Sequence, residues 1–307
     1  MAPSARSRGG PLRDDGNVPV STSPPIVTGP SWADSRNRGM PSAPLHESDE
    51  PAVERRPAAL VERLRTGSRI AVQRRRWSRR ARTWNDGAVT NTGLSATIAA
   101  VVAEARVEGG MTVLDMGCGS GQLTLPIARR GARVVAVDVS DAMIELLHEN
   151  LDREGLENVS SKVMALERLT LPPASLDIVV SNYALHHLTD AEKRRLLAAV
   201  RVWLRPAGRL VVGDLMLGRG GDPRDRAIIA EKVMALARRG PGGWWRILKN
   251  AWRFTARTSE RPLSMDAWAR LLRESGFSHV ATMPIISEAA VVSGVRPHVD
   301  PGQPEPR

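Results

Sequence analysis

The fold is decided by a stretch of nine residues, VLDMGCGSG at positions 113–121. Val113 and Leu114 are typical of a buried strand, and the alternating glycines that follow indicate a tight turn that opens a helix. Glycine lets a ligand approach the backbone without obstruction by a Cβ atom. The stretch therefore predicts a strand, a turn and a helix with a ligand at the turn.

The glycine spacing argues against a dinucleotide at this turn. The fingerprint for NAD or FAD is G-x-G-x-x-G, whereas here Gln122 takes the position of the third glycine and Gly121 comes one residue early. The turn thus lacks the usual pyrophosphate site.

A second strand, VVAVD at residues 134–138, ends in an acid about 20 residues after the first glycine, where a carboxylate meets ribose hydroxyls. The alternative role of Asp138 is structural, because Ser140 and Asp141 follow it and begin a helix. Together with the glycine turn, its position favours ribose binding.

The rest of the chain alternates short apolar runs with helical stretches, which is the pattern of a parallel sheet. We predict strands at residues 112–115, 134–139, 162–166, 177–181, 209–214, 280–285 and 289–292. Thr189-Asp190-Ala191-Glu192 is a capping box that begins a helix. Arg205-Pro206-Ala207-Gly208 is expected to turn the chain from that helix into the fifth strand.

These segments, together with DIVVSNYALHHL at residues 177–188, resemble the class I S-adenosylmethionine-dependent methyltransferases over residues 106–296. The resemblance implies an α/β fold with a Rossmann-like, doubly wound, mostly parallel seven-stranded sheet whose last strand is antiparallel. It implies S-adenosyl-L-methionine as the cofactor and methyl transfer by in-line displacement as the activity. We expect the acceptor to be a small, apolar or aromatic organic molecule.

The same resemblance assigns the cofactor-binding residues. Asp115, Gly117, Gly119 and Gly121 are expected to hold the methionine part, with Asn182 beside it, and Asp138 the ribose.

Val139 and Met143 are expected to pack on the adenine. Many members have an Asp and an apolar residue in the loop after the third strand, where this chain has Ala165-Leu166-Glu167. Either Glu167 substitutes for that Asp or backbone groups alone contact the adenine.

Two histidines after the fourth strand, His186 and His187, are the candidate catalytic bases. A proton must leave if the acceptor is a hydroxyl or an acidic carbon, and histidine is the usual agent near neutral pH. The alternative for each histidine is a role in packing or helix capping.

We expect five regions. They are a disordered segment at 1–50, N-terminal helices covering the active site at 51–110, the methyltransferase domain at 111–296, a helical lid at 217–262 within it, and a disordered tail at 297–307. The lid contains Trp244, Trp245, Trp252 and Phe254 among basic residues, which suits an apolar acceptor, a membrane surface or a simple helical core.

Composition narrows the setting. The chain has a single cysteine, Cys118, so an intramolecular disulfide or a cysteine metal cluster is not expected. An apolar run of membrane-spanning length is missing, as is a secretory h-region, and we therefore expect a cytoplasmic protein with at most peripheral membrane contact.

The formal net charge is +11, and the densest basic run comprises Arg74, Arg75, Arg76, Arg79, Arg80 and Arg82. The run fits a solvated helix face, but it also allows an RNA or protein methyltransferase as the alternative function. Only Trp77 and Trp84 are interleaved with these arginines, which disfavours RNA. A non-catalytic, nucleoside-binding homologue is the second alternative.

Overall fold

The computed structural model describes residues 57–88, 92–218, 223–238, 261–286 and 288–298, together with 240, 242 and 245. All of them belong to the unit formed by residues 55–307. The predicted disordered segment lies outside the described residues, as do most of the predicted tail and the lid residues Trp244, Trp252 and Phe254.

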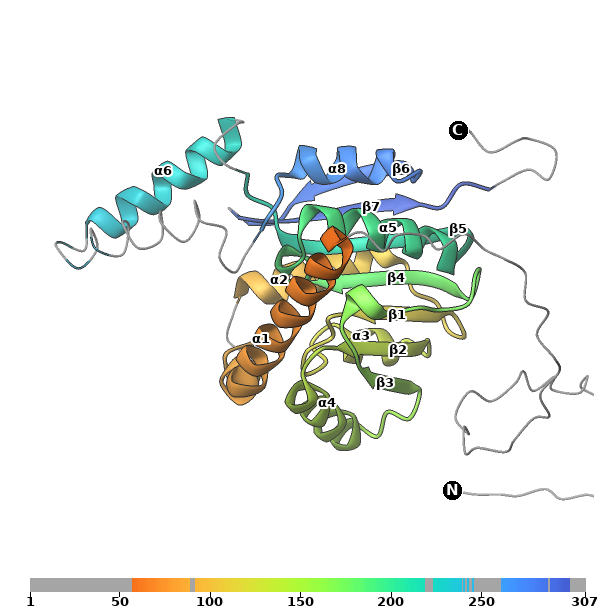
Figure 1. The fold of residues 1–307 in the computed structure, drawn as a ribbon. Coiled ribbons are helices and arrows are strands. Elements are labelled where there is room, and N and C mark those ends of the chain that lie inside the picture. Colours follow the sequence, from red (N-terminus) through yellow and green to blue (C-terminus); the bar gives the residue numbers. More distant parts are fainter. Residues whose placement is uncertain are drawn as a thin grey trace, which may run out of the picture. The chain divides into compact units, whose positions relative to one another are not determined.

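Seven strands form one sheet in the order β3-β2-β1-β4-β5-β7-β6 (Figure 1). Their bounds are β1 Thr112–Met116, β2 Arg133–Asp138, β3 Val159–Val163, β4 Leu176–Asn182, β5 Leu204–Leu215, β6 Ser278–Pro284 and β7 Ala289–Val295. Strands β1 to β5 pair in parallel, and β7 runs antiparallel to both β5 and β6. The predicted fold class is therefore confirmed.

The strand order reverses between β1 and β4. Because β2 and β4 lie on opposite sides of β1, the chain leaves β1 in one direction and later returns on the other side. In open α/β sheets, ligands bind at this switch point, outside the carboxyl ends of the strands.

The described helices are α1 Pro57–Ala88, α2 Thr92–Ala105, α3 Thr124–Ala128, α4 Asp141–Glu154, α5 Asp190–Trp203, α6 Pro223–Ala237 and α8 Met265–Glu274, with short 3₁₀ turns η1 Leu166–Arg168 and η2 Leu185–His187. The predicted capping box is present: the Glu192 backbone N–H donates to Thr189 Oγ1, and the Thr189 N–H donates to the Glu192 carboxylate. Ser140 caps α4 by accepting a hydrogen bond from the Met143 N–H.

None of the described helices combines the length and the apolar character needed to cross a membrane.

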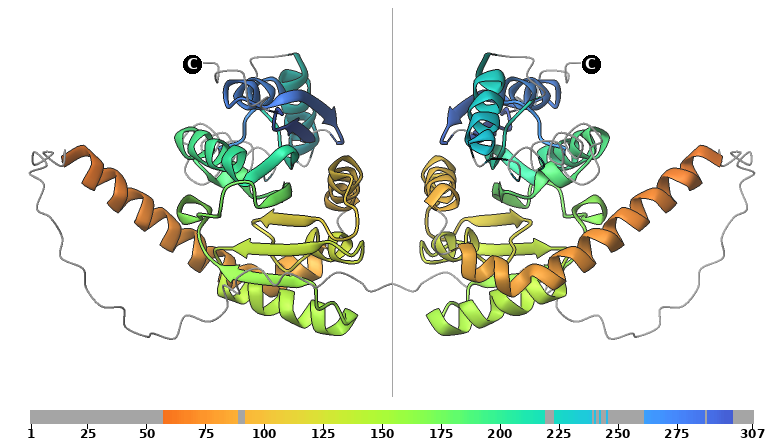
Figure 2. Two further views of the ribbon diagram at one scale, coloured as in Figure 1. Left: turned by 90° about the vertical axis from the view of Figure 1, so that its right-hand side faces the viewer. Right: turned by 90° about the vertical axis from the view of Figure 1, so that its left-hand side faces the viewer.

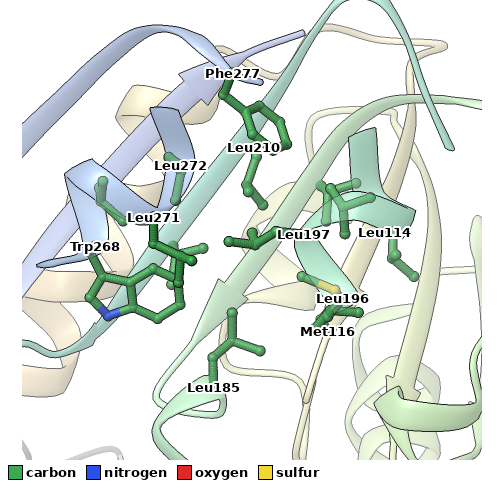
Figure 3. Close-up of a cluster of buried hydrophobic side chains, with 14 of the residues drawn as sticks. Leu114, Met116, Leu185, Leu196, Leu197, Leu210, Trp268, Leu271, Leu272 and Phe277 are labelled. Atoms are coloured by element: carbon green, nitrogen blue, oxygen red, sulfur yellow. The ribbon is translucent and has the colours of Figure 1, made fainter. Parts of the chain in front are cut away.

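Helices cover both faces of the sheet because its central strands are apolar on both faces. On one face, Leu114, Val179 and Leu210 pack against α5 and α8, including Leu197 and Trp268 (Figure 3). The opposite face presents the alternate residues of the same strands, and they pack against α2 and α3 in a second cluster: Val113, Ile178, Val180 and Val211. This alternation is the two-residue period of a strand.

The bounds of the third strand were predicted wrongly. It was expected at residues 162–166, but β3 is Val159–Val163, and the chain enters η1 at Leu166. β3 pairs only with β2 in the described sheet, and its residues VSSKV are half-buried or exposed, so it lacks the apolar run of a central strand. Ala165 is instead buried after the strand has ended.

The predicted turn at residues 205–208 lies within β5. The register between β4 and β5 shifts here, and Ala207 has a positive φ of 64°. The turn is thus an irregularity at the beginning of β5.

Candidate functional site

A crevice with two adjoining lobes lies at the carboxyl ends of β1, β2 and β4. The β1 lobe has an empty volume of about 570 Å³ and includes Asp115, Gly119 and Asn182 in its lining. The β2 lobe, of about 450 Å³, includes Val139 and Glu167. Both lobes are lined by Trp77, Gly117, Asp138, Ala184 and His187, so they form one continuous site.

The three glycines of the turn have different neighbours. A Cβ on Gly117 would lie 2.3 Å from the Cβ of Ala184, and one on Gly121 would lie 2.6 Å from Leu147 Cδ1. At Gly119 the nearest atom would be Met143 Sδ, at 4.0 Å. Gly117 and Gly121 therefore permit close packing, whereas Gly119 leaves open space in the β1 lobe. Gly121 does not line the crevice.

Asp115 is a fully buried carboxyl group at the end of β1. Its Oδ2 accepts a hydrogen bond of 2.6 Å from Thr124 Oγ1, and its Oδ1 is buried without a partner. The pKa of Asp115 is raised to about 7: burial raises it most, the hydrogen bond from the Thr124 hydroxyl lowers it, and the nearby Asp138 carboxylate raises it.

Asp138, at the end of β2, is held by backbone donors. The Gly119 N–H donates to Oδ2 at 3.0 Å and the Ser140 N–H to Oδ1 at 2.8 Å. Burial raises the pKa of Asp138, and these backbone bonds oppose that shift. Asp138 thus connects the glycine turn to the beginning of α4. It therefore has a structural role at the beginning of this helix, which is the alternative considered from the sequence.

Asn182, the last residue of β4, and Tyr183, which follows it, line the β1 lobe. Asn182 Oδ1 is buried without a partner, like Asp115 Oδ1. Tyr183 has a positive φ of 53°, its N–H bonds to the Gly213 carbonyl, and burial raises the pKa of its hydroxyl. Non-glycine residues with a strained backbone conformation, such as Tyr183, are concentrated at functional sites.

The residues predicted to contact adenine are divided between the lobes. Val139, Leu166 and Glu167 line the β2 lobe, while Met143 lines the β1 lobe. Burial raises the pKa of Glu167. Met143 is 2% exposed and packs with Ala81 of α1.

The two histidines lie in different surroundings. His187 lines both lobes, and its ring lies 5.5 Å from the Trp77 ring, edge to face. His186 is buried and lines neither lobe; its Nδ1 lies 2.5 Å from Asp214 Oδ1 at the end of β5. The two imidazole centroids are 4.1 Å apart. Sequence reasoning missed Asp214, since only the fold brings β5 beside η2.

Helix α1 lies in the region 51–110 that was expected to cover the active site, and two of its tryptophans, which sequence reasoning did not assign to the site, line the crevice. Trp77 and Trp84 lie seven residues apart on one helix face, their rings are 5.6 Å apart, and both line the β1 lobe. The same face packs on Met143 and Leu146 of α4 (Figure 2, α1 in orange). The signal was available in the i, i+7 spacing of the two tryptophans.

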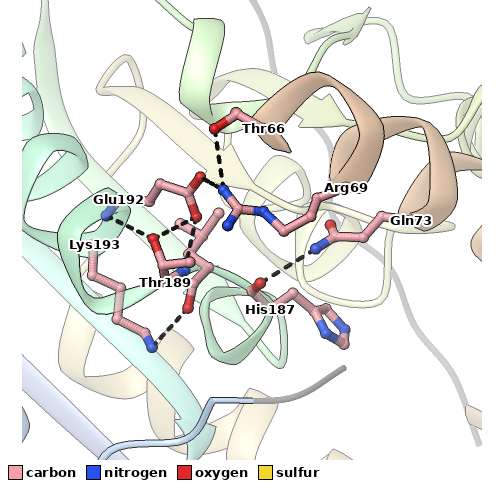
Figure 4. A network of polar contacts seen from close by, with 8 residues as sticks. Thr66, Arg69, Gln73, His187, Thr189, Glu192 and Lys193 are labelled. Atoms are coloured by element: carbon pink, nitrogen blue, oxygen red, sulfur yellow. Dashed lines mark hydrogen bonds and ion pairs between the residues drawn. The ribbon is translucent and has the colours of Figure 1, made fainter. Parts of the chain in front are cut away.

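Polar contacts fix α1 to η2 and α5 (Figure 4). Arg69 forms an ion pair with Glu192, which is buried, and Gln73 Nε2 donates to the His187 carbonyl at 3.2 Å. At the other end of the contact, Ser78 Oγ donates to Asp141 Oδ1 at 2.8 Å. Helix α1 is thus attached to η2 and α5 and also to α4.

Comparison with known proteins places this geometry in context. Residues 113–208 match a family described as a methyltransferase domain. An uncharacterized methyltransferase of Geobacillus kaustophilus is 34% identical over 109 residues, which are 34% of this chain and 47% of that protein. A ubiquinone biosynthesis O-methyltransferase of Methylocella silvestris is 31% identical over 140 residues, 45% of this chain and 53% of that protein. The chain thus spans about half the length of these relatives.

A similar fold occurs in the crystal structure of a 1,6-didemethyltoxoflavin-N1-methyltransferase of Burkholderia thailandensis with bound S-adenosylhomocysteine. Its TM-score is 0.53 at 19% sequence identity, and the match covers 83% of this chain and 93% of that one. At this identity the likeness concerns the fold alone.

Proposed function

We propose that this chain, which contains a class I S-adenosylmethionine-dependent methyltransferase domain, transfers the methyl group of that cofactor to a small apolar or aromatic acceptor. The observation that carries the proposal is the charge of the crevice. The described residues that line it include Asp115, Asp138 and Glu167 but no lysine or arginine. Such a crevice suits a ligand that is cationic and has no phosphate, as S-adenosylmethionine is through its ammonium and sulfonium groups.

The unpartnered atoms of the β1 lobe fit the methionine part. Asp115 Oδ1 and Asn182 Oδ1 are buried acceptors, and leaving such an atom unsatisfied costs about 1–3 kcal/mol. An ammonium group is a donor only and would satisfy acceptors of this kind. The missing Cβ of Gly119 leaves room beside them.

The other residues fit the nucleoside part. The backbone bonds that hold Asp138 leave lone pairs on its carboxylate for ribose hydroxyls. Val139 and Leu166 offer apolar surface in the β2 lobe for a purine ring, with Glu167 as a polar neighbour. Met143 contributes apolar surface in the β1 lobe.

When bound, S-adenosylmethionine supplies a methyl group on positively charged sulfur. The protein must then align the acceptor and exclude water. Trp77, Trp84 and Leu94 give the β1 lobe apolar walls from α1 and α2, which favour an apolar or aromatic acceptor. The Methylocella relative is named for ubiquinone biosynthesis, which supports a small-molecule acceptor.

For an acceptor that must lose a proton, we assign the accepting group to the histidine pair. His187 faces both lobes and is the histidine within reach of a bound molecule. His186, held by Asp214, contacts the His187 ring and supports its orientation.

The test is to incubate the purified protein with S-adenosylmethionine carrying a labelled methyl group, in parallel with a panel of small phenols and quinols, total RNA and a protein extract. Label in a small organic product supports the proposal. Label confined to RNA or protein favours the alternative acceptors, and cofactor binding without transfer to any of them indicates a non-catalytic nucleoside-binding protein.

A further inference from the structure

A larger cavity lies beside the crevice, between α1, η1 and α5. This α1–α5 cavity has an empty volume of about 1320 Å³. It shares Leu166, Glu167 and Leu188 with the β2 lobe and none of its lining residues with the β1 lobe. A molecule in it would therefore lie on the nucleoside side of the crevice. On the proposed function, that is the wrong side for an acceptor, so the cavity is a separate site.

The floor of the α1–α5 cavity is apolar. Leu169, Leu196 and Trp203 line it, and all three are buried. Ala199, on the same side of α5 as Leu196 and Trp203, leaves space where a larger side chain would project. An apolar body of a ligand could thus replace water over this floor at a favourable free energy.

The rim of the cavity is cationic. Arg168 of η1 and Arg195 of α5 are exposed lining residues, and neither forms an ion pair with another described residue. The lining also contains two acids: Glu192 is paired with Arg69, and burial raises the pKa of Glu167, which favours its neutral form. Two exposed guanidinium groups beside an apolar floor complement an anion, because arginine binds carboxylate and phosphate groups through paired N–H donors.

We propose that the α1–α5 cavity binds a small amphipathic anion, with an aromatic or aliphatic body and a single carboxylate, sulfonate or phosphate group. Helix α1 lines both this site and the crevice. Thr66 of α1 lines the cavity, and Trp77 of the same helix lines both lobes of the crevice. Arg69 and Gln73 attach the intervening turns to α5 and η2 (Figure 4).

The first experiment measures binding of 1-anilinonaphthalene-8-sulfonate by its fluorescence. We expect one saturable site that S-adenosylhomocysteine does not displace. Ala199→Trp should fill the cavity and weaken binding by at least about tenfold, and Arg195→Gln should weaken it about threefold to tenfold. Arg194→Gln is the matched control, because this neighbouring arginine is paired with Glu274 outside the cavity, and it should leave binding unchanged.

The second experiment tests the requirement for negative charge. Dodecanoate should displace the dye at a lower concentration than dodecanol, which has the same chain without the carboxylate. Thermal melting of each variant identifies any loss of folding. The proposal is wrong if Ala199→Trp and Arg195→Gln fold and bind the dye as the wild type does, if the two competitors are equally effective, or if S-adenosylhomocysteine displaces the dye competitively. None of these readouts depends on methyl transfer. A negative result here would therefore refute the anion site without refuting the proposed methyltransferase activity, and the reverse also holds.

Discussion

Two aspartates at neighbouring strand ends differ because their surroundings differ. Both oxygens of Asp138 accept backbone N–H groups, whereas Asp115 has one oxygen on Thr124 and one without a partner. Asp138 is therefore oriented before a ligand arrives, and Asp115 has an unmet need for a donor. Sequence reasoning selected both residues from the strand ends and the glycine turn, but burial and hydrogen bonding decide how each one acts.

Cofactor affinity should depend on pH through Asp115. With a pKa of about 7, its carboxyl group holds a proton below neutrality, whereas a ligand ammonium group favours the carboxylate. Affinity should therefore fall as the pH is lowered from about 8 to 5.5, by up to about tenfold per pH unit below the pKa. Calorimetric titration with S-adenosylhomocysteine measures this dependence.

Asp115→Asn is the control for that titration. It removes the titrating group, so affinity should be lower and the slope between pH 5.5 and 7 should be much shallower. The raised pKa of Asp138 contributes a dependence of the same sign. An equally steep slope in the folded variant would assign the effect to another group.

Asp138→Ala should weaken cofactor binding by about 1–3 kcal/mol, because it removes hydrogen bonds to a charged acceptor. Asp152→Ala, at the exposed C-terminal end of α4, is the control and should bind normally. Unchanged affinity in a folded Asp138→Ala protein would leave Asp138 with only its structural bonds to Gly119 and Ser140.

At the scale of elements, the glycine turn and α1 both line the crevice. The turn could be predicted because its spacing is local. Helices over the active site were also expected at 51–110, but the contacts that attach α1 could not be predicted, because Arg69 to Glu192 and Gln73 to His187 join residues more than 100 positions apart. The bounds of β3 were predicted wrongly because a polar edge strand has little apolar pattern. The apolar residues that follow the strand pack against the core from the turn after it.

Alanine substitutions in the turn should separate stability from binding. Gly117→Ala places a Cβ 2.3 Å from Ala184 at a φ of 75°, so it should lower the free energy of unfolding by more than the roughly 1 kcal/mol of an unfavourable φ alone. Gly119→Ala has no such overlap, and its Cβ enters the β1 lobe, so cofactor affinity should fall more than stability. Denaturant unfolding and calorimetry measure the two effects. Equal loss of stability in both variants would contradict this division.

The attachment of α1 should be measurable in a double-mutant cycle of Arg69→Ala and Glu192→Gln. Arg69 is 33% exposed and Glu192 3%, so solvent screens the pair in part, and we expect a coupling of about 1–2 kcal/mol. The control cycle uses Arg194 and Glu274, an exposed pair at the surface, which should couple by less than about 0.5 kcal/mol. A coupling as small as the control would mean that this pair does not hold α1.

At the scale of the whole molecule, most of the sheet followed from sequence alone. Alternating apolar runs and helices, with clear caps and turns, determine a doubly wound order, and the switch point between β1 and β4 then places the crevice. What the sequence could not provide was side-chain arrangement: the meeting of His186 with Asp214, the separation of Met143 from Val139, and the α1–α5 cavity. Each depends on packing between elements distant in the chain.

The central claim is that the crevice selects a phosphate-free, cationic nucleoside cofactor. The most direct measurement is calorimetric titration of the full chain with S-adenosylmethionine and, separately, with NAD⁺ under the same conditions at pH 8. We predict binding of one S-adenosylmethionine per chain and no detectable heat with NAD⁺. Tighter binding of NAD⁺, or no binding of S-adenosylmethionine by the folded protein, would contradict the account.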